Sequence, residues 1–237
     1  GSEMCIRDRN IAVFGSSGAI GSALCLEYAN NTNINKLFSF SRNGNGPNHE
    51  LIIKKKVDYL DEKSLEDASK VIDVKLDLII VAIGMLDNPE KSIRDISKEK
   101  FFKMFEANTI PTALIGKYFI PTFYKDRTTK FASLSARVGS IDDNELGGWY
   151  SYRASKTALN MILKNFSIEQ KRVNPQNIII GLHPGTVDSI LSKPFQKKNK
   201  EYFSPEFAAK KLREVIENKS MSDNGKIFDW DNKVIPS

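Results

Sequence analysis

Apolar runs of strand length alternate along the chain with longer segments in which apolar residues recur at helical spacing. The strand-length runs lie at 10–15, 36–41, 51–58, 76–84, 130–136, 176–185 and 225–230. The helical pattern covers 20–30, 62–72, 98–123, 149–172 and 204–218. Strands that alternate with helices are typical of a parallel sheet with helices on both faces. The pattern therefore predicts one doubly wound α/β domain over 10–237, with a mostly parallel sheet of about seven strands.

Composition narrows the class of protein. The 237 residues are 41% apolar and 27% charged, with a formal net charge of +6. This length suits a single α/β domain, and the apolar share is enough for a sizeable core. The basic residues are scattered, with short runs at 54–56 and 197–198 and no stripe interleaved with aromatic residues, which argues against nucleic-acid binding. The longest apolar stretch, 76–86, is too short to cross a membrane.

The cysteines and the N-terminal segment point to a cytoplasmic protein. Cys5 and Cys25 have no metal-ligand spacing and cannot form a disulfide framework, so we expect a reducing compartment and no metal site. Residues 1–9 lack the apolar core of a signal peptide. Because the periodic pattern begins at Asn10, we interpret 1–9 as a non-native or disordered extension.

A glycine turn follows the first predicted strand directly. In "FGSSGAIGSA", Gly15, Gly18 and Gly21 are spaced three apart and lead into the first helix. A dinucleotide pyrophosphate needs backbone amides at close range, which side chains in the turn would obstruct, and the helix N-terminus favours negative charge. This Rossmann-type pattern predicts a nicotinamide cofactor at the turn, held by Gly15, Ser16, Ser17, Gly18, Ala19, Ile20 and Gly21.

The end of the second strand favours one cofactor over another. An NAD site usually places an acidic residue there to bind the ribose 2′-hydroxyl, but this chain has Ser41 and Arg42. A guanidinium binds a 2′-phosphate through several donors. The sequence therefore favours NADP(H), with NAD(H) as the alternative.

A tyrosine and a lysine one helical turn apart are the candidate reacting groups. Tyr152 and Lys156 share a helix face in "WYSYRASK", whereas Tyr150 points elsewhere. An ammonium group near a phenol favours the phenolate and lowers its pKa, which makes tyrosine a usable acid and base. Tyr59 and Lys63 have the same spacing, but their position near an outer helix predicts a surface pair.

Six motifs in order resemble the short-chain dehydrogenase/reductase family over almost the whole chain. They are "GSSGAIG", Asp58 in "VDYLD", Asn108 in "FEANTIPTALIGKYFIP", "SLSARVGSI", "YRASKTALN" and "HPGTVDS". The combination is most similar to the branch of C-factor-like and small carbonyl-reductase-like proteins. The resemblance implies hydride transfer between a nicotinamide and a carbonyl or alcohol. It also implies a homodimer or homotetramer formed through 98–123 and 149–172.

The resemblance assigns catalytic roles. Tyr152 would be the general acid/base, and Lys156 would lower its pKa and bind the nicotinamide ribose. Asn108 would hold a water for a proton relay, where Pro111 leaves a helical carbonyl without its partner. The family's serine stands three residues before a glycine, but Ala136 is three before Gly139. We expect a bulge to bring Ser135 into the site, with Ser133 as the alternative.

The resemblance also extends the cofactor site. Asp58 would bind the adenine amino group, and further contacts would come from Ala82, Ile83, Gly84, Pro184, Gly185, Thr186, Val187 and Ser189. His183 is interpreted as structural. An apolar substrate pocket is expected from Met85, Leu86, Trp149 and Phe195.

Two other functions stay open at the level of sequence. One is an epimerase or dehydratase of the same family. The other is a cofactor-binding signalling or regulatory protein whose chemistry has lapsed, as the resemblance to C-factor and Ala136 together suggest.

Overall fold

The computed structural model describes residues 8–31, 33–189, 192–193 and 202–237. Within this part of the chain, eight strands form one sheet in the order β3-β2-β1-β4-β5-β6-β7-β8. The strands are β1 Arg9–Phe14, β2 Ile34–Ser41, β3 Ile52–Lys56, β4 Leu78–Val81, β5 Thr129–Leu134, β6 Asn177–His183, β7 Ile227–Asp229 and β8 Val234–Ile235. β1 to β7 pair in parallel, and β8 returns antiparallel to β7. The predicted fold class is confirmed, with β8 as an additional strand.

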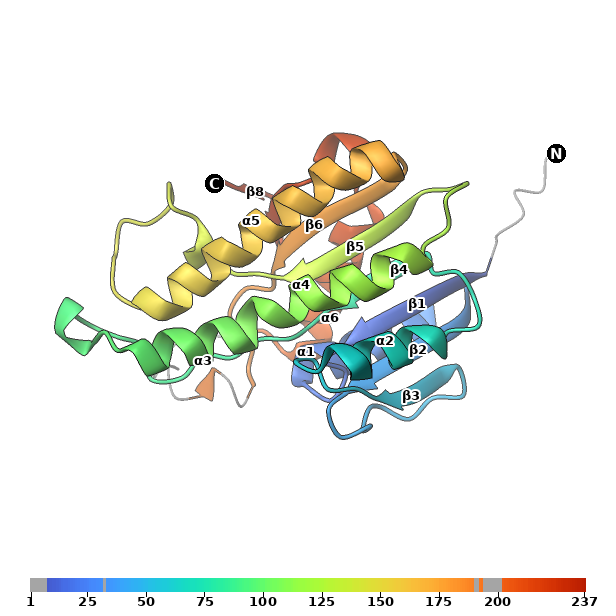
Figure 1. Ribbon diagram of the computed structural model, residues 1–237, viewed down its shortest axis with the longest axis horizontal. Helices are drawn as coiled ribbons and strands as arrows, with labels where there is room; N and C mark the ends of the chain where they lie inside the picture. The colour runs from blue at the N-terminus through green and yellow to red at the C-terminus, as the bar shows by residue number, and fades with distance from the viewer. Residues whose placement is uncertain (1–7, 32, 190–191, 194–201) are drawn as a thin grey trace.

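Six α-helices flank this sheet in the described residues: α1 Ala19–Asn31, α2 Glu62–Lys70, α3 Lys98–Asn108, α4 Ile110–Phe119, α5 Tyr150–Val173 and α6 Pro205–Glu217. α1 and α6 pack on one face of the sheet, and α2, α4 and α5 pack on the other (Figure 1). The strand order reverses between β1 and β4. In open α/β sheets ligands bind beside the carboxyl ends of the strands at such a reversal.

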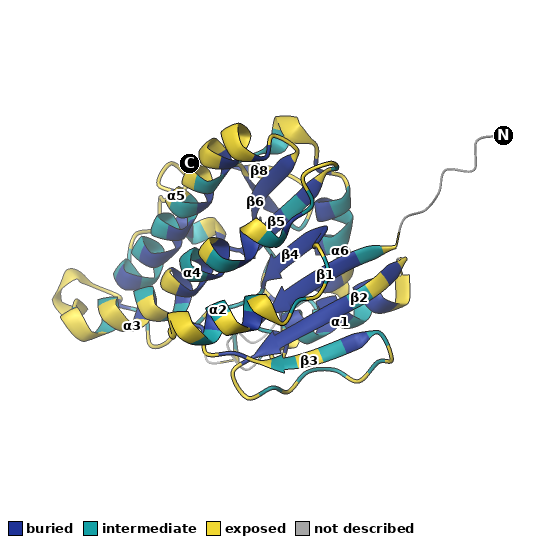
Figure 2. Cartoon of the chain, turned by 45° about the vertical axis from the view of Figure 1, so that its right-hand side comes forward, coloured by how far each residue is buried: buried dark blue, intermediate teal, exposed yellow. Residues whose placement is uncertain are grey.

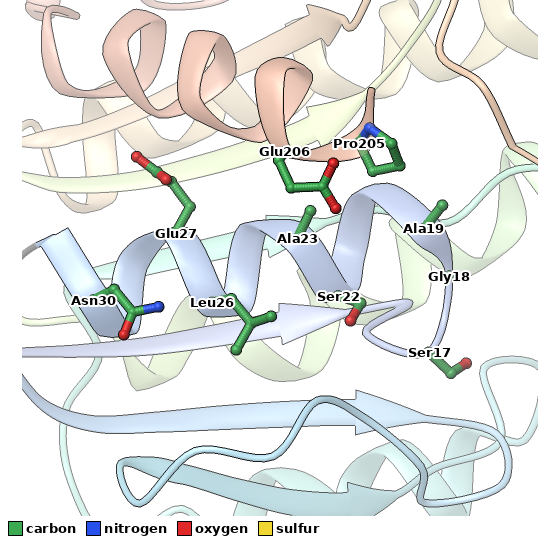
Figure 3. Close-up of a pocket in the computed structure, with 10 residues that line it drawn as sticks. All are labelled: Ser17, Gly18, Ala19, Ser22, Ala23, Leu26, Glu27, Asn30, Pro205 and Glu206. Atoms are coloured by element: carbon green, nitrogen blue, oxygen red, sulfur yellow. The ribbon is translucent and has the colours of Figure 1, made fainter. Parts of the chain in front are cut away.

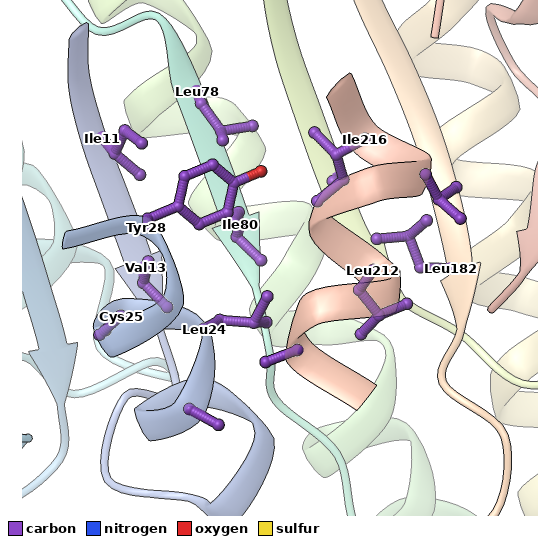
Figure 4. Close-up of a cluster of buried hydrophobic side chains, with 14 of the residues drawn as sticks. Ile11, Val13, Leu24, Cys25, Tyr28, Leu78, Ile80, Leu182, Leu212 and Ile216 are labelled. Atoms are coloured by element: carbon purple, nitrogen blue, oxygen red, sulfur yellow. The ribbon is translucent and has the colours of Figure 1, made fainter. Parts of the chain in front are cut away.

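Two apolar cores hold these layers together. Strand residues point alternately to the two faces, so each central strand contributes to both cores and is buried throughout (Figure 2). On the α1/α6 side, Leu24 and Tyr28 pack with Leu212 and Ile216 against the strands (Figure 4). Truncation of a buried leucine such as Leu212 to alanine costs about 2–5 kcal/mol, so these contacts anchor the helices that flank the glycine turn.

The helix starts are fixed by side chains that accept hydrogen bonds from backbone amides. Ser204 accepts from the amide of Phe207, with Pro205 at the first helical position. Ser97 accepts from the amide of Lys100 at 3.3 Å and begins α3. Lys103, Glu106 and Ala107 of α3 line one of the cavities described below.

The long helix predicted over 98–123 is interrupted. α3 ends at Asn108, Thr109 has φ −118° and ψ −58°, and α4 begins at Ile110. Pro111 has no amide hydrogen to donate to the carbonyl of Ala107, so one hydrogen bond of the helical ladder is missing there. The break places Asn108 and Thr109 against α5, as described below.

The N-terminal boundary also differs from the expectation. Arg9 is the first residue of β1, and its guanidinium binds the Glu217 carboxylate at 2.8 Å. Arg9 is therefore part of the fold and not of an extension, while 1–7 lie outside the described residues. No helix in the described ranges is long and apolar enough to cross a membrane.

Candidate active site

The glycine turn between β1 and α1 is closely packed against the strand beside it. Gly15 has φ +83°, and a Cβ at this position would lie 2.5 Å from the carbonyl oxygen of Ala82. A Cβ on Gly21 would lie 2.2 Å from the carbonyl oxygen of Gly15. Both positions therefore require glycine. Ser17 and Gly18 lead directly into the N-terminus of α1, where the first amides have no acceptor within the helix (Figure 3).

Two adjoining cavities lie at the carboxyl edge of the sheet and share part of the glycine turn. The first, of about 510 Å³, extends from the turn over the ends of β2 and β3. The second, of about 570 Å³, extends towards β5, α5 and the segment after β6. We call them the β2-side cavity and the α5-side cavity. A third hollow of about 570 Å³ also borders the turn at Ser17 and Gly18 and lies between α1 and the start of α6 (Figure 3).

Most of the predicted cofactor residues line these two cavities. The β2-side cavity is lined by Gly15, Ser17, Gly18, Arg42, Asp58, Ala82, Ile83 and Gly84, among others. Among those of the α5-side cavity are Ala19, Ile20, Gly21, Tyr152, Lys156, Pro184 and Ser189. The cradle that a Cβ would fill, the helix N-terminus and the basic Arg42 together fit a phosphorylated dinucleotide.

Ser16 and Ser41 are predicted cofactor residues whose side chains point into the protein. Ser16 is fully buried, and its hydroxyl donates to the carbonyl of Phe40 at 2.9 Å. Ser41 is fully buried as well and donates to the carbonyl of Asn45 at 2.6 Å. Their hydroxyls shape the turn and the loop after β2 rather than line either cavity.

Three predicted residues after Pro184 lie beside the cavities rather than in their lining. Gly185 has φ +76° and packs against the ring of Phe203. Thr186 is exposed and accepts a backbone hydrogen bond from Phe203, and Val187 is buried and pairs with the same residue. This segment is thus held by Phe203, which no feature of the sequence indicated.

Tyr152 and Lys156 meet in the α5-side cavity, one helical turn apart on α5. Burial raises the pKa of the Tyr152 phenol to about 12. Burial also lowers the pKa of the Lys156 ammonium to about 8. Both shifts have the same cause, because each charged form is poorly solvated there, and the lowering of the Tyr152 pKa expected from Lys156 is not seen. Lys156 donates to the carbonyl of Leu134 at 3.1 Å, and the ring of Trp149 packs edge-on to Tyr152.

Asn108 joins the segment after β4 to α5. Its amide donates to the carbonyl of Met85 at 2.9 Å, and its carbonyl accepts from the amide of Met85 at 2.7 Å. The same amide donates to the Ser155 hydroxyl at 3.1 Å, and Thr109 donates to the Ser155 carbonyl at 2.8 Å. A Cβ on Gly84 would lie 3.4 Å from both Asn108 Oδ1 and Lys156 Nζ, so the asparagine and the lysine are neighbours.

A glycine-rich phosphate cradle, a tyrosine and a lysine therefore share one cleft at the strand-order reversal. The sequence model of the family described as short chain dehydrogenase matches residues 9–200. The chain belongs to the short-chain dehydrogenase family.

Individual members of this family resemble the chain to different extents. A 1-hydroxy-2-glutathionyl-2-methyl-3-butene dehydrogenase of Rhodococcus sp. (strain AD45) is 30% identical over 173 residues, 72% of this chain and 74% of that protein. C-signal of Myxococcus xanthus is 25% identical over 146 residues, 61% of this chain and 83% of that protein.

Solved structures share the fold closely at low identity. NADPH-bound carbonyl reductase from chicken fatty liver is 21% identical with a TM-score of 0.86, covering 98% of this chain and 95% of that one. Carbonyl reductase Sniffer of D. melanogaster is 18% identical with a TM-score of 0.86, covering 98% of this chain and all of that one.

The serine expected in this family is the main difference between expectation and structure. The β5–β6 ladder runs without a register shift to Leu134 and continues as Ser135 N–H donates to the Leu182 carbonyl at 2.7 Å, so the predicted bulge is absent. Ser135 nevertheless lines the α5-side cavity. Its hydroxyl donates to Asn160 Oδ1 at 2.6 Å. Ser133 is buried, 3.3 Å from the Thr112 hydroxyl, away from the cavity lining.

His183 ends β6 next to Pro184. Its Nδ1 is buried and has no hydrogen-bond partner among the described residues. Burial lowers the pKa of this imidazole to about 4, and the nearby Arg137 contributes to the shift, so the ring is neutral at physiological pH. The described residues contain no group of three or more His, Cys, Asp or Glu side chains arranged to hold a metal.

The expected substrate pocket is partly present. Met85 and Leu86 line the α5-side cavity together with Leu134 and Asp87. Trp149 contacts Tyr152 and adopts a left-handed backbone with φ +53°. Phe195 lies outside the described residues.

Three contributors were not found by sequence reasoning. Asn160 binds Ser135 and lies four residues after Lys156, a spacing that could have indicated it. Glu90 is buried at the N-terminus of α5, where its carboxylate accepts from the Ser151 amide at 3.3 Å. Tyr59, expected in a surface pair, is buried instead, and Lys63 pairs with Asp67.

Proposed function

We propose that this protein is an NADP(H)-dependent oxidoreductase that reduces a carbonyl substrate or oxidises the corresponding alcohol. The observation that carries the proposal is the placement of Tyr152 and Lys156 in a cavity continuous with the glycine turn. A nicotinamide bound there supplies or takes up the hydride. The protein then has to move one proton at the substrate oxygen, and Tyr152 is the acid in the cavity wall placed to do so.

The two reacting side chains act as a pair. The Tyr152 hydroxyl donates its proton to the carbonyl oxygen during reduction and accepts it during oxidation. The pKa of Lys156 is about 8, so its side chain is mostly protonated at neutral pH. The ammonium then stabilises the Tyr152 phenolate that remains after proton transfer. Asn108 fixes the segment beside Lys156, which suits the expected relay of a proton to solvent.

Ser135 is proposed to orient the substrate carbonyl. Its hydroxyl proton points to Asn160, so rotation about Cβ–Oγ is needed to turn it to the substrate. The other end of the Asn160 side chain is also held in place, because its amide donates to the Gly139 carbonyl at 3.3 Å.

The preference for NADP(H) rests on the β2-side cavity. Arg42 lines it near the end of β2, where the chain has no carboxylate to repel a 2′-phosphate. Asp58, two residues after β3, lines the same cavity and is proposed to accept from the adenine amino group. Of the solved structures that share the fold, a carbonyl reductase from chicken fatty liver has NADPH bound and a putative short-chain dehydrogenase/reductase from Burkholderia multivorans has NADP bound.

The test is oxidation of NADPH, followed at its absorbance maximum, with a panel of aldehydes, ketones and diketones, and with NADH for comparison. Tyr152→Phe should lower kcat/KM about 10²–10⁴-fold, since general acid catalysis contributes on that scale. Tyr150→Phe, a neighbour outside the cavity lining, is the matched control and should stay within about twofold of the unchanged protein. Full activity in Tyr152→Phe would contradict the assignment.

A second candidate function is a cofactor-binding regulatory protein without turnover. Ala136 at the position of the family's serine and the bond from Ser135 to Asn160 favour it, as does the similarity to C-signal. Tight NADPH binding by the unchanged protein, with no oxidation across the whole panel, would support this function and exclude the reductase.

A further inference from the structure

Tyr59 connects the two parts of the cofactor cleft. It follows β3 in the chain, and its ring lines the β2-side cavity together with Arg42, Asp58 and Leu60. The side chain is only 6% exposed. Its hydroxyl reaches across to the glycine turn, where it accepts from the amide of Gly15 at 2.9 Å. One side chain thus contacts both the wall of the cavity and the first residue of the turn.

The same hydroxyl is part of a dense set of hydrogen bonds at the end of β2. The carbonyl of Phe40 accepts from the Tyr59 hydroxyl at 2.9 Å and from the Ser16 hydroxyl at 2.9 Å. It also accepts from the amides of Gly15 and Ser16, at 3.0 and 3.2 Å, so the Gly15 amide is shared between Phe40 and Tyr59. The Ser39 hydroxyl donates to Ser16 Oγ at 2.7 Å. The other groups belong to β2 or to the turn, whereas Tyr59 belongs to the segment after β3. Tyr59 thus joins this third segment to the turn.

The hydroxyl needs to be neutral to fill both roles. Burial raises the pKa of the Tyr59 phenol to about 12, so the proton that it donates to Phe40 is retained throughout the working pH range. As a neutral hydroxyl it donates to one backbone carbonyl and accepts from one backbone amide. Phenylalanine would preserve the ring in the cavity wall and remove both bonds.

We propose that Tyr59 is a positioning residue for cofactor binding, which holds the Gly15 amide and thereby sets the conformation of the glycine turn. This inference rests on the proposed function, because it concerns the same dinucleotide. The ring contributes to the adenosine end of the site, and the hydroxyl contributes to the pyrophosphate end. Loss of the hydroxyl therefore weakens binding of a ligand that reaches the turn and leaves a ligand confined to the adenosine end unaffected.

The experiment compares Tyr59→Phe with the unchanged protein in equilibrium titrations with NADPH and with adenosine 2′-monophosphate, which lacks the pyrophosphate. We expect NADPH affinity to fall about two- to tenfold, the effect of losing one or two net hydrogen bonds. Adenosine 2′-monophosphate affinity should not change. Tyr28→Phe is the matched control, since Tyr28 is fully buried on the opposite face under α1 and α6 (Figure 4). It should change neither affinity.

Amide hydrogen exchange at Gly15, measured by NMR without ligand, gives a second readout. Exchange should become severalfold faster in Tyr59→Phe and stay unchanged in Tyr28→Phe. Equal NADPH affinity in Tyr59→Phe and the unchanged protein, or equal loss for both ligands, overturns the inference while the proposed function stands. An unchanged protein that binds no NADPH overturns the proposed function, and the inference falls with it.

Discussion

The glycine turn and the α5-side cavity adjoin each other but are built on opposite principles. At the turn, polar groups have several partners, and the carbonyl of Phe40 faces four donors. In the α5-side cavity, Lys156 is buried with one hydrogen bond to Leu134, and burial alone displaces the pKa values of both Tyr152 and Lys156. The start of the turn is rich in hydrogen bonds, whereas the two side chains proposed to react are held away from water.

The difference fits the role proposed for each region. A turn that receives a pyrophosphate gains affinity when its amides are fixed beforehand, because little conformational entropy is lost on binding. Poor solvation favours a pair of acid–base side chains. Electrostatic interactions with a bound ligand are stronger in a poorly solvated site, so they shift the pKa values of the pair further. Hydrogen bonds thus stabilise the turn, whereas the two side chains proposed to react are buried at a cost in stability.

Of the substitutions that test this comparison, the one with the largest expected effect acts on catalysis. Lys156→Met should lower kcat about 10²–10⁴-fold, because the substitution removes the charge that favours the Tyr152 phenolate. NADPH affinity should fall far less, since the turn is intact. Lys164→Met, on the exposed side of the same helix, is the control. Equal losses in kcat and in affinity would contradict the division of roles.

The next effect concerns the turn. Gly15→Ala should destabilise the fold and lower NADPH affinity at least tenfold, because alanine at φ +83° is strained and its Cβ would meet the Ala82 carbonyl. Gly147→Ala isolates the strain, since Gly147 has φ +63° with no atom within 4 Å of an added Cβ. That control should lose about 1 kcal/mol in unfolding free energy and no NADPH affinity. Equal behaviour of the two variants would show that close packing at the turn is unimportant.

A smaller effect is the pH dependence of stability. Lys156 has a pKa of about 8 in the fold and an ordinary value of 10.5. Between these values the unfolded chain binds more protons, so stability rises with pH, and the full penalty is present below pH 8. From about pH 8 to 10 the unfolding free energy should rise by about 2 kcal/mol relative to Lys156→Met. Urea unfolding of both proteins at several pH values measures this difference, and parallel curves would refute it.

Sequence periodicity predicted the architecture because the determining forces are local or directly patterned. Buried strands such as β4 read as continuous apolar runs, and Gly15 and Gly21 mark a turn that no side chain fits. β8 was missed since two residues carry too little pattern. The break at Thr109 was only partly foreseen from Pro111, because its position depends on docking against Ser155 of another helix.

The side-chain partners of the site were harder to predict than its location. That Tyr152 and Lys156 lie together could be predicted because one helix carries both, and both line the α5-side cavity. The orientation of Ser135 depends on Asn160, and the burial of Tyr59 depends on how the end of β3 meets the turn. These contacts join segments far apart in the chain, so no local spacing encodes them.

Asn108 carries a consequence of its own. Its amide gives Met85 the same donor and acceptor that a neighbouring strand residue would give, so a side chain completes a backbone pairing after β4 has ended. Aspartate has the same shape but no hydrogen to donate to the Met85 carbonyl. Glutamine is one methylene too long to bind the Met85 amide and the Met85 carbonyl at once. The position therefore demands asparagine for architectural reasons, before any role in proton transfer is considered.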